Sequence, residues 1–172
     1  RGERPVEARI VGLNYAPLAV TRGAGDDATN PARERAEALL LHAATENPSA
    51  ETLHALGKFY LAEKRFKEAN ERFERAAKLA PDNARIESDW GAALLEMGKK
   101  SLLEQDGAKA LEYLDRSLKH LEKAIELDPK MPEPRFNRAL NLQTLGVPEQ
   151  AKQAWREYLD FDPNSQWAEE AG

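Results

Sequence analysis

One stretch, from Ala50 to Pro81, restricts the possible folds of this chain more than any other. Large, small and aromatic residues recur in it at fixed offsets: Leu53, Leu56, Gly57, Tyr60, Ala69, Phe73, Ala76 and Pro81. Gly57 and Ala69 are small enough for two helices to cross closely, while the rings of Tyr60 and Phe73 fill the space beside such a crossing. Pro81 cannot continue a helix. The pattern therefore predicts a helix–turn–helix unit, with helices near residues 50–63 and 67–80.

These eight residues match all eight marked offsets of the tetratricopeptide repeat (TPR), a helix–turn–helix unit of about 34 residues, so the stretch resembles a repeat of that family. The resemblance implies an all-α TPR superhelix, an α-solenoid in which each repeat packs on its neighbours. It also implies a scaffold that binds proteins and is not an enzyme.

The rest of the chain divides at similar marks. Asn30 and Pro31, a capping residue followed by proline, indicate the start of the first helix. Pro129 and Pro163 are 34 residues apart, and Trp167 is expected to cover the last repeat. The predicted units are an extended segment and linker (1–30) and a TPR domain (31–172), which comprises a half repeat (31–46), three repeats (50–83, 84–131 and 132–165) and the start of a capping helix (166–172).

The second of these repeats is 14 residues longer than the period, since Pro81 and Pro129 are 48 residues apart. The apolar residues at 111, 114, 118, 121 and 125 step by three and four, which predicts one helix with a single apolar stripe. Leu102 and Leu103 would supply the facing helix, with a turn at residues 105–107. The simplest account lengthens both helices by about two turns each, so that they project as a hairpin. The alternative is a loop from residue 98 to about 106, because Gly98 stands where the first helix of an ordinary repeat ends.

Residues 1–30 lack a helical pattern. Val6 to Ile10 alternate between apolar and polar, which is the period of a half-buried strand. A turn at residues 12–14 would lead to a second extended piece at 15–21, and residues 23–27 have the composition of a flexible link. Two strands alone are marginal in water, so this segment is expected to lean on the flank or end of the helical stack.

Composition excludes several classes of protein. A net charge of −5 argues against nucleic acid or an anionic membrane surface as the main partner. The chain has no cysteine, so disulfides are excluded and the compartment stays open. No apolar run approaches the ~18 residues of a membrane span, and no signal peptide is visible. Because the sequence starts with Arg1, we expect it to be a piece of a longer chain.

No constellation in the sequence indicates catalysis, a cofactor or a metal ion. The histidines, at positions 42, 54 and 120, have no partner at metal or triad spacing, and HExxH, P-loop and nucleophile-elbow patterns are absent. Gly23-Ala24-Gly25 is an isolated GxG without a strand–helix context. The acidic pairs (26 with 27, 104 with 106, and 169 with 170) are interpreted as solvated surface or helix-start charge.

The partner-binding residues follow from the TPR resemblance. In TPR proteins an inner, concave stripe on the first helix of each repeat holds the ligand, and carrying it over by offset gives His54, Lys58, Leu61, Ser88, Asp89, Ala92, Leu95, Phe136, Asn137, Leu140 and Gln143. Lys58 is the only cation in this stripe, which disfavours the carboxylate-gripping mode of some TPR proteins.

The apolar members of the stripe have two interpretations. They are either core, or a groove for an extended apolar segment of a protein or peptide. Val6, Ile10, Tyr15 and Leu18 form such a segment, so the N-terminus is predicted to lie in its own groove or in that of a second copy.

The whole arrangement also resembles the TPR region of multidomain bacterial proteins that carry caspase-like CHAT domains or anti-sigma zinc fingers. The resemblance rests on residues 4–9, 15–18 and 21–23, on the insertion, and on residues 136–140 and 155–159. It implies a module of a larger signalling or regulatory protein, whose protease and zinc-finger motifs these residues lack. The alternative is an assembly module, possible as a homodimer, that associates through the long hairpin or by N-terminal exchange.

Overall fold

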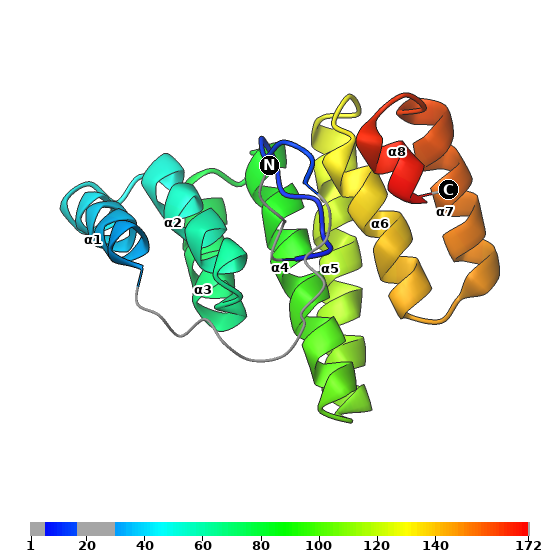
Figure 1. The fold of residues 1–172 in the computed structure, drawn as a ribbon, viewed down its shortest axis with the longest axis horizontal. Coiled ribbons are helices and arrows are strands. Elements are labelled where there is room, and N and C mark those ends of the chain that lie inside the picture. Colours follow the sequence, from blue (N-terminus) through cyan, green and yellow to red (C-terminus); the bar gives the residue numbers. More distant parts are fainter. Residues whose placement is uncertain (1–5, 17–29, 172) are drawn as a thin grey trace.

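The computed structural model describes residues 6–16 and 30–171 of the chain, and within these ranges it contains helices and no strand. The first seven helices lie side by side in the order of the sequence, and the short last helix folds back between the sixth and the seventh (Figure 1). Their bounds are α1 Pro31–Glu46, α2 Ala50–Ala62, α3 Phe66–Leu79, α4 Ala84–Leu103, α5 Gly107–Leu127, α6 Glu133–Thr144, α7 Pro148–Phe161 and α8 Gln166–Ala171. The all-α solenoid predicted from the sequence is confirmed.

Three helical hairpins, α2–α3, α4–α5 and α6–α7, form the body of the solenoid, and each turns in the same way. Three residues separate the two helices of every hairpin, and the middle residue has a left-handed backbone: Lys64 (φ 59°), Gln105 (φ 61°) and Gly146 (φ 73°). The amide nitrogens that follow also bond to equivalent carbonyls, for example Arg65 to Tyr60 and Asp106 to Ser101. The same local geometry therefore closes the ordinary hairpins and the lengthened one.

Helix starts coincide with the capping residues of the sequence. The Asn30 side chain accepts a hydrogen bond from the amide of Ala32, and Pro31 is the first helical residue, as predicted. Asn83 and Asp106 cap α4 and α5 through their side chains. Each cap provides an acceptor for amide groups that lack a partner within the helix.

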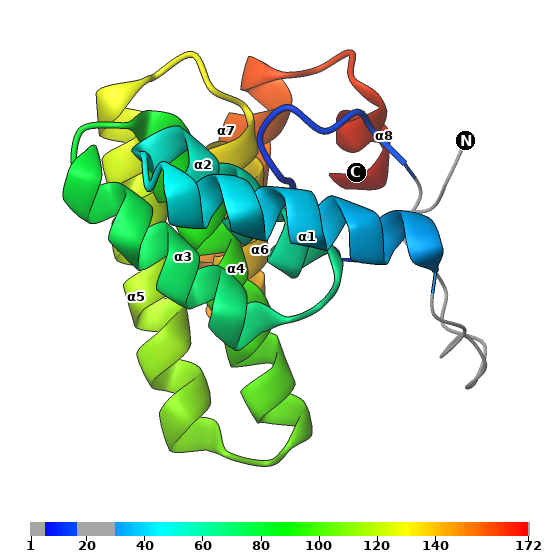
Figure 2. The same ribbon diagram turned by 90° about the vertical axis from the view of Figure 1, so that its left-hand side faces the viewer.

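The 14 additional residues of the second hairpin extend both of its helices. Helix α4 has 20 residues against 13 in α2, and α5 has 21 against 14 in α3. The hairpin consequently protrudes beyond the ends of the neighbouring helices (Figure 2). Gly98 lies inside α4, so the alternative of a loop starting there is wrong.

The interior of this hairpin differs from the predicted one. Leu102 and Leu103 (86% exposed) point to solvent, so they do not face α5 as predicted. Leu111 is also exposed, so the predicted apolar stripe of α5 is not buried over its full length. The buried residues of α5 are Ala110, Leu114, Ser117, Leu121 and Ala124. Small residues occupy this face because the helices approach closely at two glycines of α4. A Cβ atom on Gly98 would lie 2.7 Å from Cγ of Leu114, and one on Gly91 would lie 2.6 Å from Cγ of Leu121.

We expect Gly98→Ala to reduce stability although alanine is the better helix former. Forcing a methyl group into a packed contact costs about 1–3 kcal/mol, against a gain of about 1 kcal/mol in helix propensity. Gly107→Ala is the matched control, because a Cβ atom there meets nothing within 4 Å. Urea denaturation should therefore find Gly98→Ala less stable than Gly107→Ala by about 1–3 kcal/mol. Equal stabilities would contradict the close approach of α4 and α5.

A polar cluster joins α4 to α5 on the opposite side from the N-terminal segment's contacts. The Glu87 carboxylate, 2% exposed, lies 2.7 Å from Nδ1 of His120 and accepts a hydrogen bond of 2.8 Å from Nζ of Lys123. The His120 ring also stacks on Trp90, with centroids 3.8 Å apart. Burial alone would raise the pKa of the Glu87 carboxyl group, but the contacts with His120 and Lys123 outweigh it and hold this pKa below 4.5.

Candidate functional site: the inner groove and the N-terminal segment

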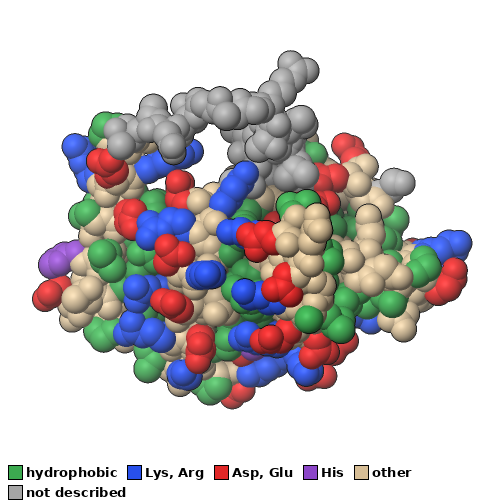
Figure 3. Space-filling model, turned by 90° about the horizontal axis from the view of Figure 1, so that it is seen from below, with side chains coloured by type: hydrophobic (Ala, Val, Ile, Leu, Met, Phe, Trp, Pro, Cys, Tyr) green, Lys and Arg blue, Asp and Glu red, His purple; other side chains and the backbone are tan. Residues whose placement is uncertain are grey.

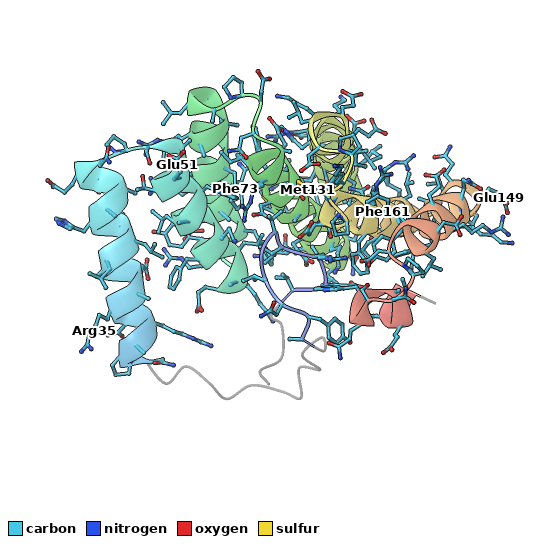
Figure 4. The ribbon with its side chains drawn as sticks, turned by 90° about the horizontal axis from the view of Figure 1, so that it is seen from above. Arg35, Glu51, Phe73, Met131, Glu149 and Phe161 are labelled. Atoms are coloured by element: carbon cyan, nitrogen blue, oxygen red, sulfur yellow. The ribbon has the colours of Figure 1, made fainter. Side chains whose placement is uncertain are left out.

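Residues 6–16, the N-terminal segment, lie along one side of the helix row, beside α8 (Figure 4). The side chains that bind their backbone come from α2, α4 and α6, which are the first helices of the three repeats. We call this surface of α2, α4 and α6 the inner groove. It is the face on which the TPR resemblance placed the partner-binding residues.

Asn137 of α6 binds the backbone of the segment with both ends of its amide. Its Oδ1 accepts the Arg9 N–H and its Nδ2 donates to the Arg9 carbonyl, each at 2.7 Å. Asn137 is fully buried. This pair of bonds takes the place of the pairing that a neighbouring strand would give, and it fixes the register of the segment in the groove.

Three further side chains bind backbone groups on either side of Arg9. Glu96 of α4 accepts the Ala8 N–H at 3.0 Å. At Val11, Asp89 of α4 accepts the N–H at 2.8 Å, and Nζ of Lys58 of α2 donates to the carbonyl at 2.5 Å. These partners belong to side chains and not to another strand, and the backbone bends at residues 6–8, so the segment is not a strand. The period-two prediction for Val6 to Ile10 is therefore correct for burial and wrong for strand pairing.

Side chains are buried in alternation from Val6 to Ile10, and Val11 is buried as well. Val6, Ala8 and Ile10 are each at most 3% exposed and belong to one continuous apolar cluster with the helices. A turn follows, in which the Leu13 N–H donates to the Ile10 carbonyl and Gly12 has φ +73°. The greater part of the predicted second extended piece and the predicted flexible link lie outside the described residues.

The guanidinium of Arg9 is bound by residues of the last two helices and of their connection. Its Nη1 donates to the Tyr158 hydroxyl and to Oδ2 of Asp162, both at 2.9 Å. Its central carbon lies 5.1 Å from the ring centroid of Trp167. Ser165 and Tyr158 also donate to the same Asp162 oxygen, at 2.9 and 3.0 Å. We call Tyr158, Asp162 and Trp167 the arginine pocket.

The ionisation states in this pocket follow from its surroundings. Burial is the main cause that raises the pKa of Tyr158 to about 12, so the phenol stays neutral. Burial would also raise the pKa of the Asp162 carboxyl group, but hydrogen bonds from Arg9, Ser165 and Tyr158 outweigh it and lower that pKa below 3.8. Near neutral pH the pocket therefore presents one negative charge beside an aromatic face.

Most of the predicted inner-stripe residues lie at or beneath the segment. Lys58, Asp89 and Asn137 bind it directly, and Nε2 of His54 lies 2.8 Å from Oδ2 of Asp89. The buried apolar members share one cluster with Val6, Ala8 and Ile10: Leu61, Ala92, Leu95, Phe136 and Leu140. These residues are therefore core, which the segment completes; that they also form a groove for a partner stays a prediction.

Two predicted residues have other surroundings. Ser88 is fully buried in the packing of α4, and Gln143 accepts a hydrogen bond from the indole of Trp155 at 2.8 Å. Neither has a described hydrogen bond to the segment.

Sequence reasoning missed several residues of the site. Glu96 lies seven positions after Asp89, hence two turns along the same face of α4, so extending the inner stripe into the lengthened helix would have found it. Lys99, which contacts Glu7 at 2.5 Å, follows on that face. Tyr158 enters the sequence analysis only within the stretch 155–159, and Trp167 only as the cover of the last repeat; its ring lies 5.2 Å from that of Phe136. Asp162 follows the end of α7 and has no local signal.

The described part of the chain offers neither a metal site nor a membrane span. Within 6–16 and 30–171, no group of three or more His, Asp or Glu side chains is arranged to hold a metal ion. Among the described helices, none combines the length and the apolarity that a membrane crossing requires.

Comparison with known proteins supports the helical-repeat fold. Two family profiles of the tetratricopeptide repeat match the chain, one at residues 50–83 and the other at residues 108–131. No curated protein sequence matches the chain significantly. The chain thus contains tetratricopeptide repeats, and its described helices form a TPR solenoid with one lengthened hairpin.

Several solved structures share the fold. The TPR domain of Arabidopsis OM64 is 20% identical, with a TM-score of 0.59 over 71% of this chain and 89% of that one. A TPR protein of the thermophile Thermus thermophilus is 20% identical, with a TM-score of 0.66 over 76% of this chain and 66% of that one. The first TPR of Spaghetti (RPAP3), bound to an HSP90 peptide, is 16% identical, with a TM-score of 0.56 over 70% and 85%. At these identities the likeness shows the fold alone.

Proposed function

We propose that this chain is a non-catalytic interaction scaffold that binds an extended segment of a partner protein in its inner groove. The observation that carries the proposal is the binding of residues 8–11 through their backbone groups by Glu96, Asn137, Asp89 and Lys58. Backbone recognition of this kind accepts an extended peptide from any source. The peptide-bound TPR of Spaghetti adds support, since its fold resembles this one.

The distribution of charge supports a protein partner over nucleic acid. On the face shown in Figure 3, Lys and Arg side chains are intermingled with Asp and Glu, and the net charge of the chain is −5. Nucleic-acid-binding surfaces instead gather cations along one face.

The N-terminal segment occupies the place that a partner would take, so it competes with the partner. A ligand's apparent affinity falls in proportion to the fraction of chains whose groove is open. A partner therefore binds only if its affinity or its concentration is high enough to displace the N-terminal segment. In the larger bacterial signalling or regulatory protein that we propose as the context, this competition would make partner binding conditional.

A labelled peptide with the sequence of residues 4–13 tests the proposal. We expect it to bind the full chain carrying Ala8→Glu at least ~10-fold more tightly than the unchanged chain. Ala8 is 1% exposed, so a buried carboxylate there should release the chain's own segment and open the groove. Fluorescence anisotropy gives both affinities.

The matched control is Leu13→Glu, which introduces the same charge at a side chain of the segment that is 49% exposed. This variant should bind the peptide as weakly as the unchanged chain. Failure of the peptide to bind any of the three chains would contradict the groove as a binding site. Equal binding to all three would show that the chain's own segment does not compete.

A second candidate function, homo-oligomeric assembly, is favoured by the tip of the long hairpin. Leu102, Leu103 and Leu111 are 44%, 86% and 60% exposed there. The N-terminal segment offers another route, because a second copy could supply it to the groove. Light scattering over a hundredfold concentration range, on the full chain and on one without residues 1–22, separates these. A dimer that persists after the deletion favours the hairpin, one that disappears favours exchange, and a monomer in both excludes assembly.

A further inference from the structure

Arg9 is held in the groove at its backbone and at its side chain. Asn137 bonds to its N–H and to its carbonyl, while its guanidinium enters the arginine pocket. Because Asn137 binds the backbone of the residue whose side chain enters the arginine pocket, the register of the segment determines which side chain occupies the pocket. A segment that lacks an arginine at this position loses the pocket contacts even if its backbone binds normally.

The arginine pocket is organised by contacts that do not involve Arg9. The Asp162 oxygen that accepts from Arg9 also accepts from Tyr158 and Ser165, so the protein itself orients the carboxylate. Trp167 is held in the core against Phe136. The Arg9 side chain is 12% exposed. A planar cation that donates to an oriented carboxylate and stacks on an indole matches arginine better than lysine, whose ammonium is a compact, strongly hydrated charge.

The residues on either side of Arg9 are restricted by burial. Ala8 is 1% exposed with its N–H bonded to Glu96, so a larger side chain would have to displace packed atoms. Ile10 is 3% exposed within the apolar cluster, and a polar side chain there would be buried without a partner.

We propose that the inner groove selects partner segments in which an arginine stands between a small residue and an aliphatic residue, with the arginine pocket as the specificity-determining site. The inference rests on the proposed function and adds the chemical class of the ligand. It makes the chain's own residues 8–10 an internal copy of the sequence that its partner carries.

Competition experiments with the Ala8→Glu full chain test this selectivity. The competitors are the unlabelled peptide of residues 4–13 and its variants Arg9→Lys, Arg9→Ala and Ala8→Leu. We expect Arg9→Ala to bind roughly 100-fold more weakly and Arg9→Lys roughly 10-fold more weakly than the unchanged peptide. Ala8→Leu should also bind about 10-fold more weakly, because it overpacks its site. Since lysine keeps the charge, its loss of affinity cannot arise from the net charge of the protein. The Leu13→Ala peptide, changed at an exposed position, is the control and should bind as the unchanged peptide does.

Changing the pocket supplies the second measurement. In the Ala8→Glu chain, Asp162→Asn should reduce the preference for the unchanged peptide over Arg9→Ala from roughly 100-fold to below about 10-fold, because the two changes remove the same interaction. Tyr158→Phe keeps the buried ring and removes one acceptor, and it gives the same comparison if Asp162→Asn does not fold.

The outcomes separate this inference from the proposed function. If the Arg9→Ala and unchanged peptides bind equally well, arginine selectivity is overturned while peptide binding stands. If the preference for arginine survives both pocket changes, the pocket assignment is overturned. If the unchanged peptide does not bind at all, the proposed function itself fails.

Discussion

Replacing Asn137 by leucine should release residues 6–16 from the groove while the helices stay folded. Asn137 is fully buried and makes two hydrogen bonds of 2.7 Å to the backbone of Arg9. Leucine has a similar size and suits the apolar surroundings, but it can make neither bond. Two hydrogen bonds contribute about 2–3 kcal/mol, which corresponds to a roughly 30- to 150-fold change in the docking equilibrium. Hydrogen exchange at the amides of Arg9 and Val11 should accelerate by that factor.

The matched control for this prediction is Asn141→Leu. Asn141 is also a fully buried asparagine of α6, one turn further on, but its Nδ2 donates to the Leu114 carbonyl of α5. This variant should lower the stability of the helices without selectively accelerating exchange in the segment. If both variants affect the Arg9 and Val11 amides to the same extent, Asn137 has no special role in docking.

A second large effect is expected from Glu87→Gln, and it should depend on pH. Glu87 is 2% exposed and loses its charge-assisted hydrogen bonds with His120 and Lys123, so the variant should be less stable by about 1–3 kcal/mol at pH 6. The pKa of this carboxyl group in the folded chain lies below its ordinary value of 4.5. Its stabilisation is therefore complete above pH 4.5 and is lost as the pH falls through the lower folded value.

Urea denaturation at pH 6 and at pH 3 measures this dependence. The difference in stability between the unchanged chain and Glu87→Gln should be smaller at pH 3 than at pH 6. Glu112→Gln is the control, because Glu112 is 64% exposed and its contact with Arg116 is 3.8 Å long, so it should change little at either pH. A difference for Glu87→Gln that is the same at both pH values would contradict the contribution of its ionised form.

The sequence predicts the solenoid because its signals are local. Gly57 and Phe73 mark a helix crossing by size alone, and indeed a Cβ atom on Gly57 would lie 2.6 Å from the Phe73 ring. The length of the second hairpin also follows from the spacing between Pro81 and Pro129. Its interior does not, because which face of α5 turns inward depends on the approach of Gly91 and Gly98. A leucine stripe indicates an amphipathic helix but does not fix its rotation against a partner.

The candidate site is predictable only on its helical side. The inner stripe includes Asp89 and Asn137, whose side chains bind the backbone of the N-terminal segment, since offset within a repeat fixes their face. The arginine pocket joins residues far apart in sequence, as in the Arg9–Asp162 pair with a separation of 153. The periodicity of apolar residues in the sequence does not predict a contact between such distant residues. Asp162 stands outside any helix, where an acidic residue usually indicates only a solvated end.

The path of the N-terminal segment has a consequence for how the molecule unfolds. In a solenoid each repeat contacts only its neighbours, so terminal repeats can open one at a time. Here one short stretch touches α2 through Lys58, α6 through Asn137 and the final turn of α7 through Tyr158. It therefore ties the first full repeat to the last and makes their opening a single cooperative event. A partner that displaced the stretch but covered only part of the groove would uncouple the first full repeat from the last. Binding would then lower the cooperativity of unfolding even in repeats that the partner does not touch.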